Sequence, residues 1–188
     1  MFESEYWHPA VTGDAVIIQR EDKEEFYPYI LLVRRKNEPY KDKLALPGGF
    51  LDSEDTSMKG CVRRELYEET NIELSGRNFD LACVLSEKDR DPRERVLSVV
   101  YYAEVIDDID KFKPTAKDDA SEANWYLLEY LDMNDLAFDH KKAIIKALHK
   151  LVEKYIALKH TQPFGSESYK KYSKIEHRYL MIMCELQN

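Results

Sequence analysis

The sequence has few cysteines, no long apolar run and no excess of positive charge. Its three cysteines, Cys61, Cys83 and Cys184, show no C-x-x-C spacing, which excludes a disulfide framework or a cysteine zinc site and favours a reducing compartment. The apolar stretches are far too short to cross a bilayer, and the acidic N-terminus has no apolar core of a secretory signal. We therefore expect a cytoplasmic protein with no membrane partner.

The charge balance is acidic, with 36 Asp and Glu against 28 Lys and Arg and a formal net charge of −8. Non-specific nucleic-acid binding needs a strongly positive face, so we expect no nucleic-acid partner. A nucleotide as a small ligand is compatible with this balance if a cation separates its phosphates from the acidic groups. The length of 188 residues and the ordinary globular composition predict one domain with a short appendage.

Short β-rich segments fill the first two-thirds of the chain, and two helical segments follow. Strands are predicted over 11–20, 26–36, 78–87, 95–105 and 123–128, with one helix inserted at about 56–70. Asp139 can cap a later helix, and apolar residues recur at helical spacing from Tyr172 to the end. This order predicts an α+β fold or an α/β sandwich, with a domain at 1–160 and a C-terminal helical extension at 161–188.

The most informative stretch is residues 48–72, GGFLDSEDTSMKGCVRRELYEETNI. Glu65, Glu68 and Glu69 share one face of the predicted helix, where like charges repel by about 0.2–0.5 kcal/mol per pair. For these carboxylates alone, a solvated helix face is the simpler interpretation. The Gly48-Gly49 pair, which lets the backbone approach a ligand or a metal, favours a site. Clustered hard oxygen ligands are what Mg²⁺ needs.

Together these residues resemble the box of the Nudix hydrolase family, G-x5-E-x7-R-E-U-x-E-E-x-G-U, in which U is a bulky aliphatic residue. Gly49 matches the box glycine, and the second half of the box is matched by Arg64, Glu65, Leu66, Glu68, Glu69 and Ile72. The chain has one residue more than the pattern before Arg64, and Asn71 replaces the last glycine. Either Glu54 or Asp55 fills the early acidic position.

The resemblance implies a Nudix α/β/α sandwich, a mixed sheet flanked by helices, to which the helical spacing of the tail adds an extra C-terminal helix. It implies attack of water on phosphorus of a nucleoside diphosphate linked to another group. Arg64 would orient the glutamates, and Mg²⁺, or Mn²⁺, would be held by Glu65, Glu68, Glu69 and the backbone carbonyl of Gly48.

The general base of this family varies between a box glutamate and a carboxylate on a later loop. In this chain the acidic loop at 117–125 supplies three later candidates, Asp118, Asp119 and Glu122, of which we select Glu122. A solvated loop is the alternative explanation for each of them. Trp125, at the end of the loop, is interpreted as a core residue.

Further segments resemble the ADP-ribose pyrophosphatase branch, which also includes repressors of NAD metabolism built on the same domain. They are HPAVTGDAVII, LLVRRKNEPYKDKLALPGGF, RDPRERVLSVVYYAEV and LAFDHKKAI. With Gly49, Arg35 and Arg93 are candidates to bind substrate, since the arginine fork suits phosphate and ribose oxygens. A turn at Asp91-Pro92 is the alternative explanation for Arg93. His140 is interpreted as a helix-start residue.

Hydrolysis of ADP-ribose to AMP and ribose 5-phosphate is the reaction that this resemblance favours. Alternative substrates are another NDP-sugar, NADH, a dinucleoside polyphosphate or a nucleoside triphosphate such as an oxidised nucleotide. A non-catalytic regulator that senses ADP-ribose is a third hypothesis, although the repressors carry a DNA-binding winged helix and only about thirty residues follow the LAFDH helix here. The tyrosine-rich tail is expected either to form a homodimer surface or to pack on its own domain.

Overall fold

A single seven-stranded mixed sheet forms the centre of the computed structural model, which describes residues 6–23, 25–107, 111–116 and 120–187. The strand order is β3-β2-β1-β6-β5, and β4 pairs with β1 while β7 pairs with β2. Only β1 and β6 run parallel among the named pairs of the described residues. The strands are β1 (Ala10–Arg20), β2 (Tyr29–Arg35), β3 (Leu44–Ala45), β4 (Gly48–Phe50), β5 (Asp80–Leu85), β6 (Val96–Ile106) and β7 (Ala120–Leu127).

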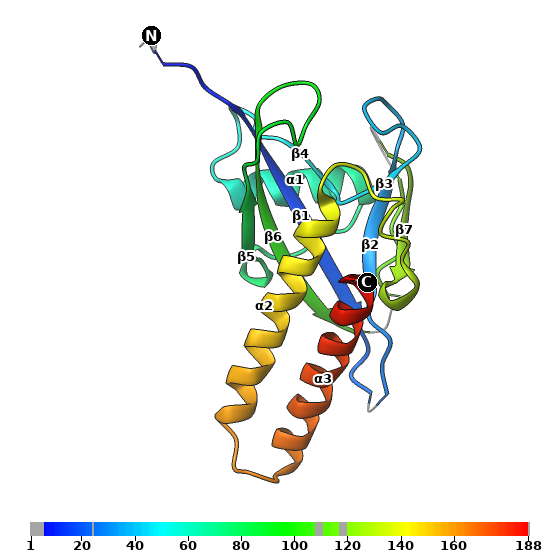
Figure 1. Ribbon diagram of the computed structural model, residues 1–188, viewed down its shortest axis with the longest axis vertical. Helices are drawn as coiled ribbons and strands as arrows, with labels where there is room; N and C mark the ends of the chain where they lie inside the picture. The colour runs from blue at the N-terminus through cyan, green and yellow to red at the C-terminus, as the bar shows by residue number, and fades with distance from the viewer. Residues whose placement is uncertain (1–5, 24, 108–110, 117–119, 188) are drawn as a thin grey trace.

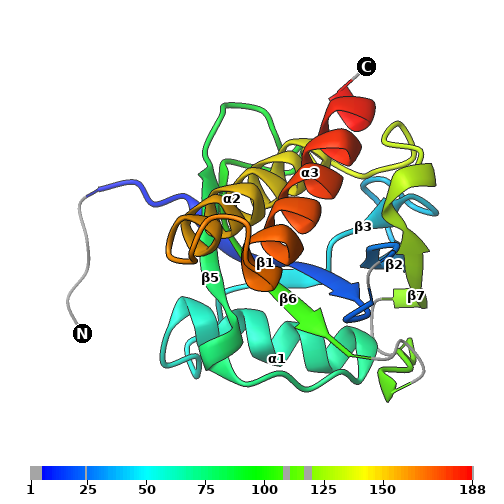
Figure 2. The same cartoon turned by 90° about the horizontal axis from the view of Figure 1, so that it is seen from below.

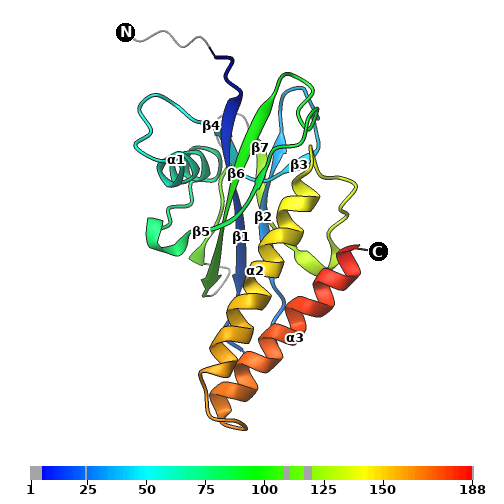
Figure 3. The same cartoon turned by 60° about the vertical axis from the view of Figure 1, so that its left-hand side comes forward.

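Helices cover both faces of the sheet and give the molecule three layers. Helix α1 (Met58–Thr70) lies on one face, whereas α2 (His140–His160) and α3 (Glu167–Gln187) lie side by side on the other (Figures 1 and 2). The α2–α3 pair extends past the end of the sheet (Figure 3). Short 3-10 turns occur at η1 (Gly76–Asn78) and η3 (Leu128–Tyr130). The predicted α/β/α sandwich with an additional C-terminal helix is confirmed.

Strand β1 supplies side chains to both cores. Val16 and Ile18 pack in the cluster beneath α2 and α3, whereas Ala15 and Ile17 pack with Leu66 of α1 on the other face. All four strand residues are fully buried. Successive residues of a strand point to opposite faces, so one continuous apolar run can fill both layers.

The predicted strands and helices lie where the structure has them, to within a few residues. Among the cap candidates at 55–57, Ser57 begins α1 by accepting a hydrogen bond from the Gly60 N–H at 3.1 Å, and Asn71 ends it with a left-handed φ of 58°. The tail packs on its own domain, since Ile175 and Tyr179 belong to the sheet-side core. The boundary at residue 160 and the homodimer stay predictions. Within the described ranges, no helix combines the length and apolarity needed to cross a membrane.

A buried polar cluster fastens α2 and α3 to the sheet. Arg20, at the end of β1, donates from Nε to Glu104 Oε1 at 2.8 Å and from Nη2 to the Tyr155 hydroxyl of α2 at 2.7 Å. Tyr155 and Tyr179 of α3 both donate to Glu104, at 2.7 and 3.0 Å. The side chains of Arg20 and Glu104 are 2% and 1% exposed, so each buried charge is compensated mainly by the other.

Replacing Glu104 with glutamine is expected to destabilise the fold strongly. Glu104→Gln leaves the buried Arg20 charge without its nearest counter-ion, which should lower the free energy of unfolding by about 3–5 kcal/mol in urea denaturation. Glu153→Gln on α2, which breaks an exposed ion pair with Lys150, should cause no measurable loss. Equal unfolding free energies for Glu104→Gln and the wild type would contradict this role.

Candidate active site

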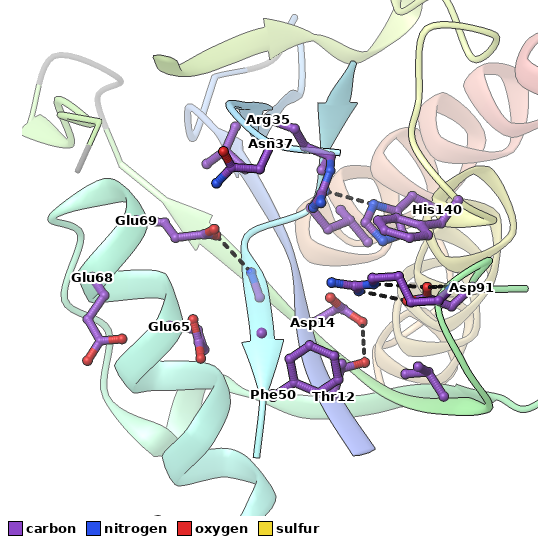
Figure 4. A pocket seen from close by; sticks show the side chains of 18 of the residues that line it. Thr12, Asp14, Arg35, Asn37, Phe50, Glu65, Glu68, Glu69, Asp91 and His140 are labelled. Atoms are coloured by element: carbon purple, nitrogen blue, oxygen red, sulfur yellow. Dashed lines mark hydrogen bonds and ion pairs between the residues drawn. The ribbon is translucent and has the colours of Figure 1, made fainter. Parts of the chain in front are cut away.

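A cavity of about 580 Å³ opens between α1 and the first turn of α2 (Figure 4). Segments far apart in the sequence line it: the start of β1, the end of β2, the β3–β4 segment, α1, and residues near 90–96 and 138–140. All but one of the predicted site residues lie on its walls, namely Arg35, Gly48, Gly49, Arg64, Glu65, Glu68, Glu69 and Arg93. The exception is Glu122.

Arg64 lies at the centre of the acidic wall of the cavity, which is formed by Glu65, Glu68 and Glu69 of α1. Its guanidinium bonds Asp55 Oδ2 and Glu65 Oε1 at 2.8 Å each and Glu68 Oε2 at 2.9 Å. One planar group with five donors can hold several carboxylates that would otherwise repel one another. The hydrogen bond from Arg64 lowers the pKa of Asp55 to about 2. Asp55 therefore occupies the place in this network that the sequence left open between it and Glu54, whose side chain is exposed.

The two glycines of the β4 strand leave room for carboxylates on both sides. A Cβ on Gly49 would lie 2.5 Å from Oε1 of Glu65, and a Cβ on Gly48 would collide with Oδ1 of Asp14. Contacts this close do not occur at real Cβ atoms, so any side chain here would push the carboxylates away. The glycine pair thus brings the backbone carbonyl and the acidic groups into one small volume.

Glu69 is the carboxylate most perturbed by its surroundings. It accepts a hydrogen bond from the Gly48 N–H at 3.0 Å. Burial raises the pKa of Glu69 to about 8, and the neighbouring carboxylates of Glu65 and Asp14 add to the effect. Burial also raises the pKa of Glu65, against the opposing effect of Arg64. Such a group of desolvated acids is relieved by a cation placed among them.

The donor chemistry of this wall fits a divalent ion. Carboxylate and carbonyl oxygens are the ligands that Mg²⁺ and Mn²⁺ prefer, and the glycine pair provides the close approach of the backbone. In the part of the chain that the structure describes, no three acidic, His or Cys side chains converge as a closed metal cluster. The three glutamates of α1 are instead held by other partners. Arg64 forms ion pairs with Glu65 and Glu68, and the Gly48 N–H donates to Glu69.

The cavity also contains an arginine and aromatic cluster. Arg93 binds both oxygens of Asp91, at 3.0 and 2.7 Å, and lies 5.1 Å from the ring centroid of Phe50. Arg35 lies 5.0 Å from the ring of Phe138. The turn predicted at Asp91 is also present, since its Oδ1 accepts from the Arg93 N–H. Guanidinium groups held in this way suit phosphate and sugar oxygens.

Glu122, the later-loop candidate for the general base that the structure describes, is not brought to this cavity. Glu122 lies on β7, where its carboxylate bonds Arg34 of β2 at 3.2 Å, because the two residues face each other across paired strands. Asp118 and Asp119 lie outside the described residues. Trp125 packs with the α1-side core, as expected, and donates to the Phe112 carbonyl at 2.6 Å.

Asp14 and His140 are cavity residues that the sequence interpretation did not assign to the site. Asp14 is 7% exposed on β1, accepts from the hydroxyls of Thr12 and Ser98, and lines the cavity. A lone carboxylate inside the apolar run VTGDAVII was an available signal, because an ionised side chain is rarely buried without a role. His140 does begin α2, as predicted, and it also lines the cavity, which helix patterning does not reveal.

Comparison with family models gives a match to the NUDIX domain over residues 9–148. The chain belongs to the Nudix family. Together with the relatives below, this match identifies it as a hydrolase of the pyrophosphatase type.

Two relatives with assigned roles differ in kind. An ADP-ribose pyrophosphatase of Methanocaldococcus jannaschii is 43% identical over 142 residues, which cover 74% of this chain and 73% of that protein. The ADPR responsive transcriptional repressor NtrR of Acinetobacter baylyi is 32% identical over 161 residues, covering 83% of this chain and 60% of the repressor. The Nudix protein thus resembles both an enzyme and a regulator.

Solved structures share the fold. A MutT/nudix family protein from Enterococcus faecalis has a TM-score of 0.73 at 26% identity and covers 96% of this chain and 77% of its own. The NUDIX domain of Shewanella oneidensis NrtR complexed with ADP ribose has a TM-score of 0.66 at 28% identity, with 78% and 90% covered. A bifunctional NMN adenylyltransferase/ADP ribose pyrophosphatase from Francisella tularensis, complexed with AMP and an Mn ion, has a TM-score of 0.63 at 31% identity, with 80% and 43% covered.

The raised pKa of Glu69 predicts a pH-dependent stability of the metal-free protein. Between its ordinary value of 4.5 and about 8, the folded state binds a proton that the unfolded state does not, so stability should fall as pH rises through this window. The effect should be on the order of 2 kcal/mol after allowance for partial exposure. Glu69→Gln should remove it in urea unfolding with EDTA at pH 5 and pH 8.

Glu54→Gln is the matched control for this comparison, since its exposed side chain lies outside the network. It should keep the pH dependence of the wild type. Parallel pH profiles for the wild type and Glu69→Gln would show that Glu69 is not the titrating group.

Proposed function

We propose that this Nudix protein hydrolyses ADP-ribose to AMP and ribose 5-phosphate with Mg²⁺ or Mn²⁺. The observation that carries the proposal is one cavity that joins the glutamates of α1 to Arg35, Arg93 and the ring of Phe138. Its volume of about 580 Å³ suits a small nucleotide ligand. The 43% identity to an ADP-ribose pyrophosphatase and the likeness to a domain solved with ADP ribose support this substrate.

In this proposal Glu65, Glu68, Glu69 and the Gly48 carbonyl hold the metal. When bound, the ion activates water and offsets the charge of the diphosphate. Arg64 orients the glutamates, and Arg35 and Arg93 bind phosphate or ribose oxygens. The water oxygen bonds to one phosphorus, the bridging P–O bond breaks, and the other phosphate leaves with the bridging oxygen.

A box glutamate is the general base that we propose. Among the candidates that the sequence offered, only the glutamates of α1 line the cavity within the described ranges, whereas Glu122 is paired with Arg34. A proton taken from water needs a carboxylate within hydrogen-bond reach of the reacting centre. The glutamates of α1 supply such carboxylates on the cavity wall.

A regulator that binds ADP-ribose without turnover is the second candidate function. The 32% identity to an ADPR responsive repressor favours it. The retained set of acidic box residues favours turnover instead, because a cation-binding wall is needed for hydrolysis and not for recognition alone. The expected cytoplasmic location and the absence of a nucleic-acid partner stay predictions.

Removing one charge from the box should abolish turnover without unfolding the protein. Glu68→Gln and Glu69→Gln should each lower kcat for ADP-ribose by orders of magnitude at saturating Mg²⁺, because each loses a proposed metal ligand. Glu54→Gln, in the preceding loop, should retain wild-type turnover. Unchanged kcat in either box variant would remove the proposed site.

A substrate panel separates the alternatives in the same assay. ADP-ribose should give the highest kcat/KM against an NDP-sugar, NADH, a dinucleoside polyphosphate and an oxidised nucleotide. Faster turnover of one of these would correct the substrate. Binding of ADP-ribose without turnover, with a DNA gel shift that ADP-ribose alters, would establish the regulator instead.

A further inference from the structure

His140 is a buried imidazole on the cavity wall across from the glutamates (Figure 4). It is 4% exposed and lies between the aromatic cluster and the backbone of the β3–β4 segment. Its ring is 5.4 Å from that of Phe138, which in turn lies 5.8 Å from the Arg93 guanidinium. The acidic network of Arg64 does not include it.

The hydrogen bond of His140 to the backbone fixes where its proton is. Nδ1 accepts from the Leu46 N–H at 3.0 Å, so this nitrogen carries no proton. Burial lowers the pKa of His140, which keeps the ring neutral. A neutral imidazole with a bare Nδ1 carries its proton on Nε2.

Within the described residues, the hydrogen bond found for the His140 ring is the one that Nδ1 accepts from Leu46, and the ring lines the cavity. A ring N–H on a cavity wall is normally paired with protein, with water or with a ligand. The remaining donor is therefore available to an oxygen inside the cavity.

We propose that His140 binds the nucleotide by donating Nε2–H to one of its phosphate or sugar oxygens. The proposal rests on the function proposed above and adds a recognition residue to it. Leu46 precedes Pro47 and Gly48, so the same ring connects the ligand to the backbone segment that carries the proposed metal-binding carbonyl. His140 acts here as a donor of fixed tautomer, and no proton transfer is assigned to it.

Two amide substitutions test the roles of the two ring nitrogens of His140 separately. His140→Asn can keep an acceptor for the Leu46 N–H but is too short to donate from the Nε2 position. His140→Gln can place an amide donor near the Nε2 position but offers the Leu46 N–H no acceptor at the Nδ1 position. His149→Asn, on the exposed side of the same helix, is the matched control.

The measurements are KM and kcat for ADP-ribose with Mg²⁺, calorimetric Kd values for ADP-ribose and AMP, and the melting temperature. His140→Asn should raise KM and the Kd for ADP-ribose about 10-fold or more while melting close to the wild type. His140→Gln should lose less than 10-fold in affinity, and so bind more tightly than His140→Asn, despite a lower melting temperature. Weaker binding of AMP as well places the acceptor oxygen on the adenylate, and an effect on ADP-ribose alone places it on the ribose phosphate.

Wild-type affinity in His140→Asn, or a 10-fold loss in His140→Gln whether or not His140→Asn folds, would overturn the proposal in favour of a purely structural contact to Leu46. The proposed function fails separately. A wild type that binds ADP-ribose without hydrolysing it contradicts the enzyme, while the Kd values still decide the role of His140. A wild type that binds neither ligand overturns both.

Discussion

The ion pairs of one guanidinium are the interaction on which the site depends. Arg64 holds Asp55, Glu65 and Glu68 at 2.8 to 2.9 Å, on a helix where neighbouring carboxylates would otherwise repel one another. Arg64 neutralises only part of this charge, and the buried Glu69 lies beside the further carboxylates of Glu65 and Asp14. The carboxylates that remain uncompensated favour binding of a divalent cation. Such an ion would also offset the negative charge of a diphosphate, so an acidic protein can accommodate that ligand.

The fold places these carboxylates on the wall of a cavity that a ligand can enter. Strand β1 pairs with β4 so that Asp14 lies opposite Gly48, which sets the glycine pair beside α1. The buried residues of α1 pack on the same strand, so the helix and the glycine turn are fixed to one support. On the other face, the cluster of Arg20 and Glu104 fixes α2, and the first residue of α2 is His140. Both walls of the cavity are thus held in place by contacts with β1.

The sequence predicted the parts of the site that follow a local rule. Helical spacing identified the glutamates, and the loop insertion before Arg64 did not obscure them. What it could not provide were contacts between distant segments. The ion pair of Arg64 with Asp55 depends on the fold of the 50–57 loop. Glu122 points away from the cavity because it pairs with Arg34 on the neighbouring strand. The orientation of the His140 ring depends on its hydrogen bond to Leu46, 94 residues earlier. Periodicity describes the face of one element, while these contacts arise from the packing of several.

Binding of Mn²⁺ followed by electron paramagnetic resonance is the most direct measurement of the central claim. The signal of free Mn²⁺ should decrease as protein is added, and it should decrease much less with Glu65→Gln, which removes one charge from the α1 wall. Added Mg²⁺ should compete and restore the signal. A free-ion signal that is unchanged by the wild-type protein, with and without AMP, would show that these carboxylates are not assembled to hold a metal.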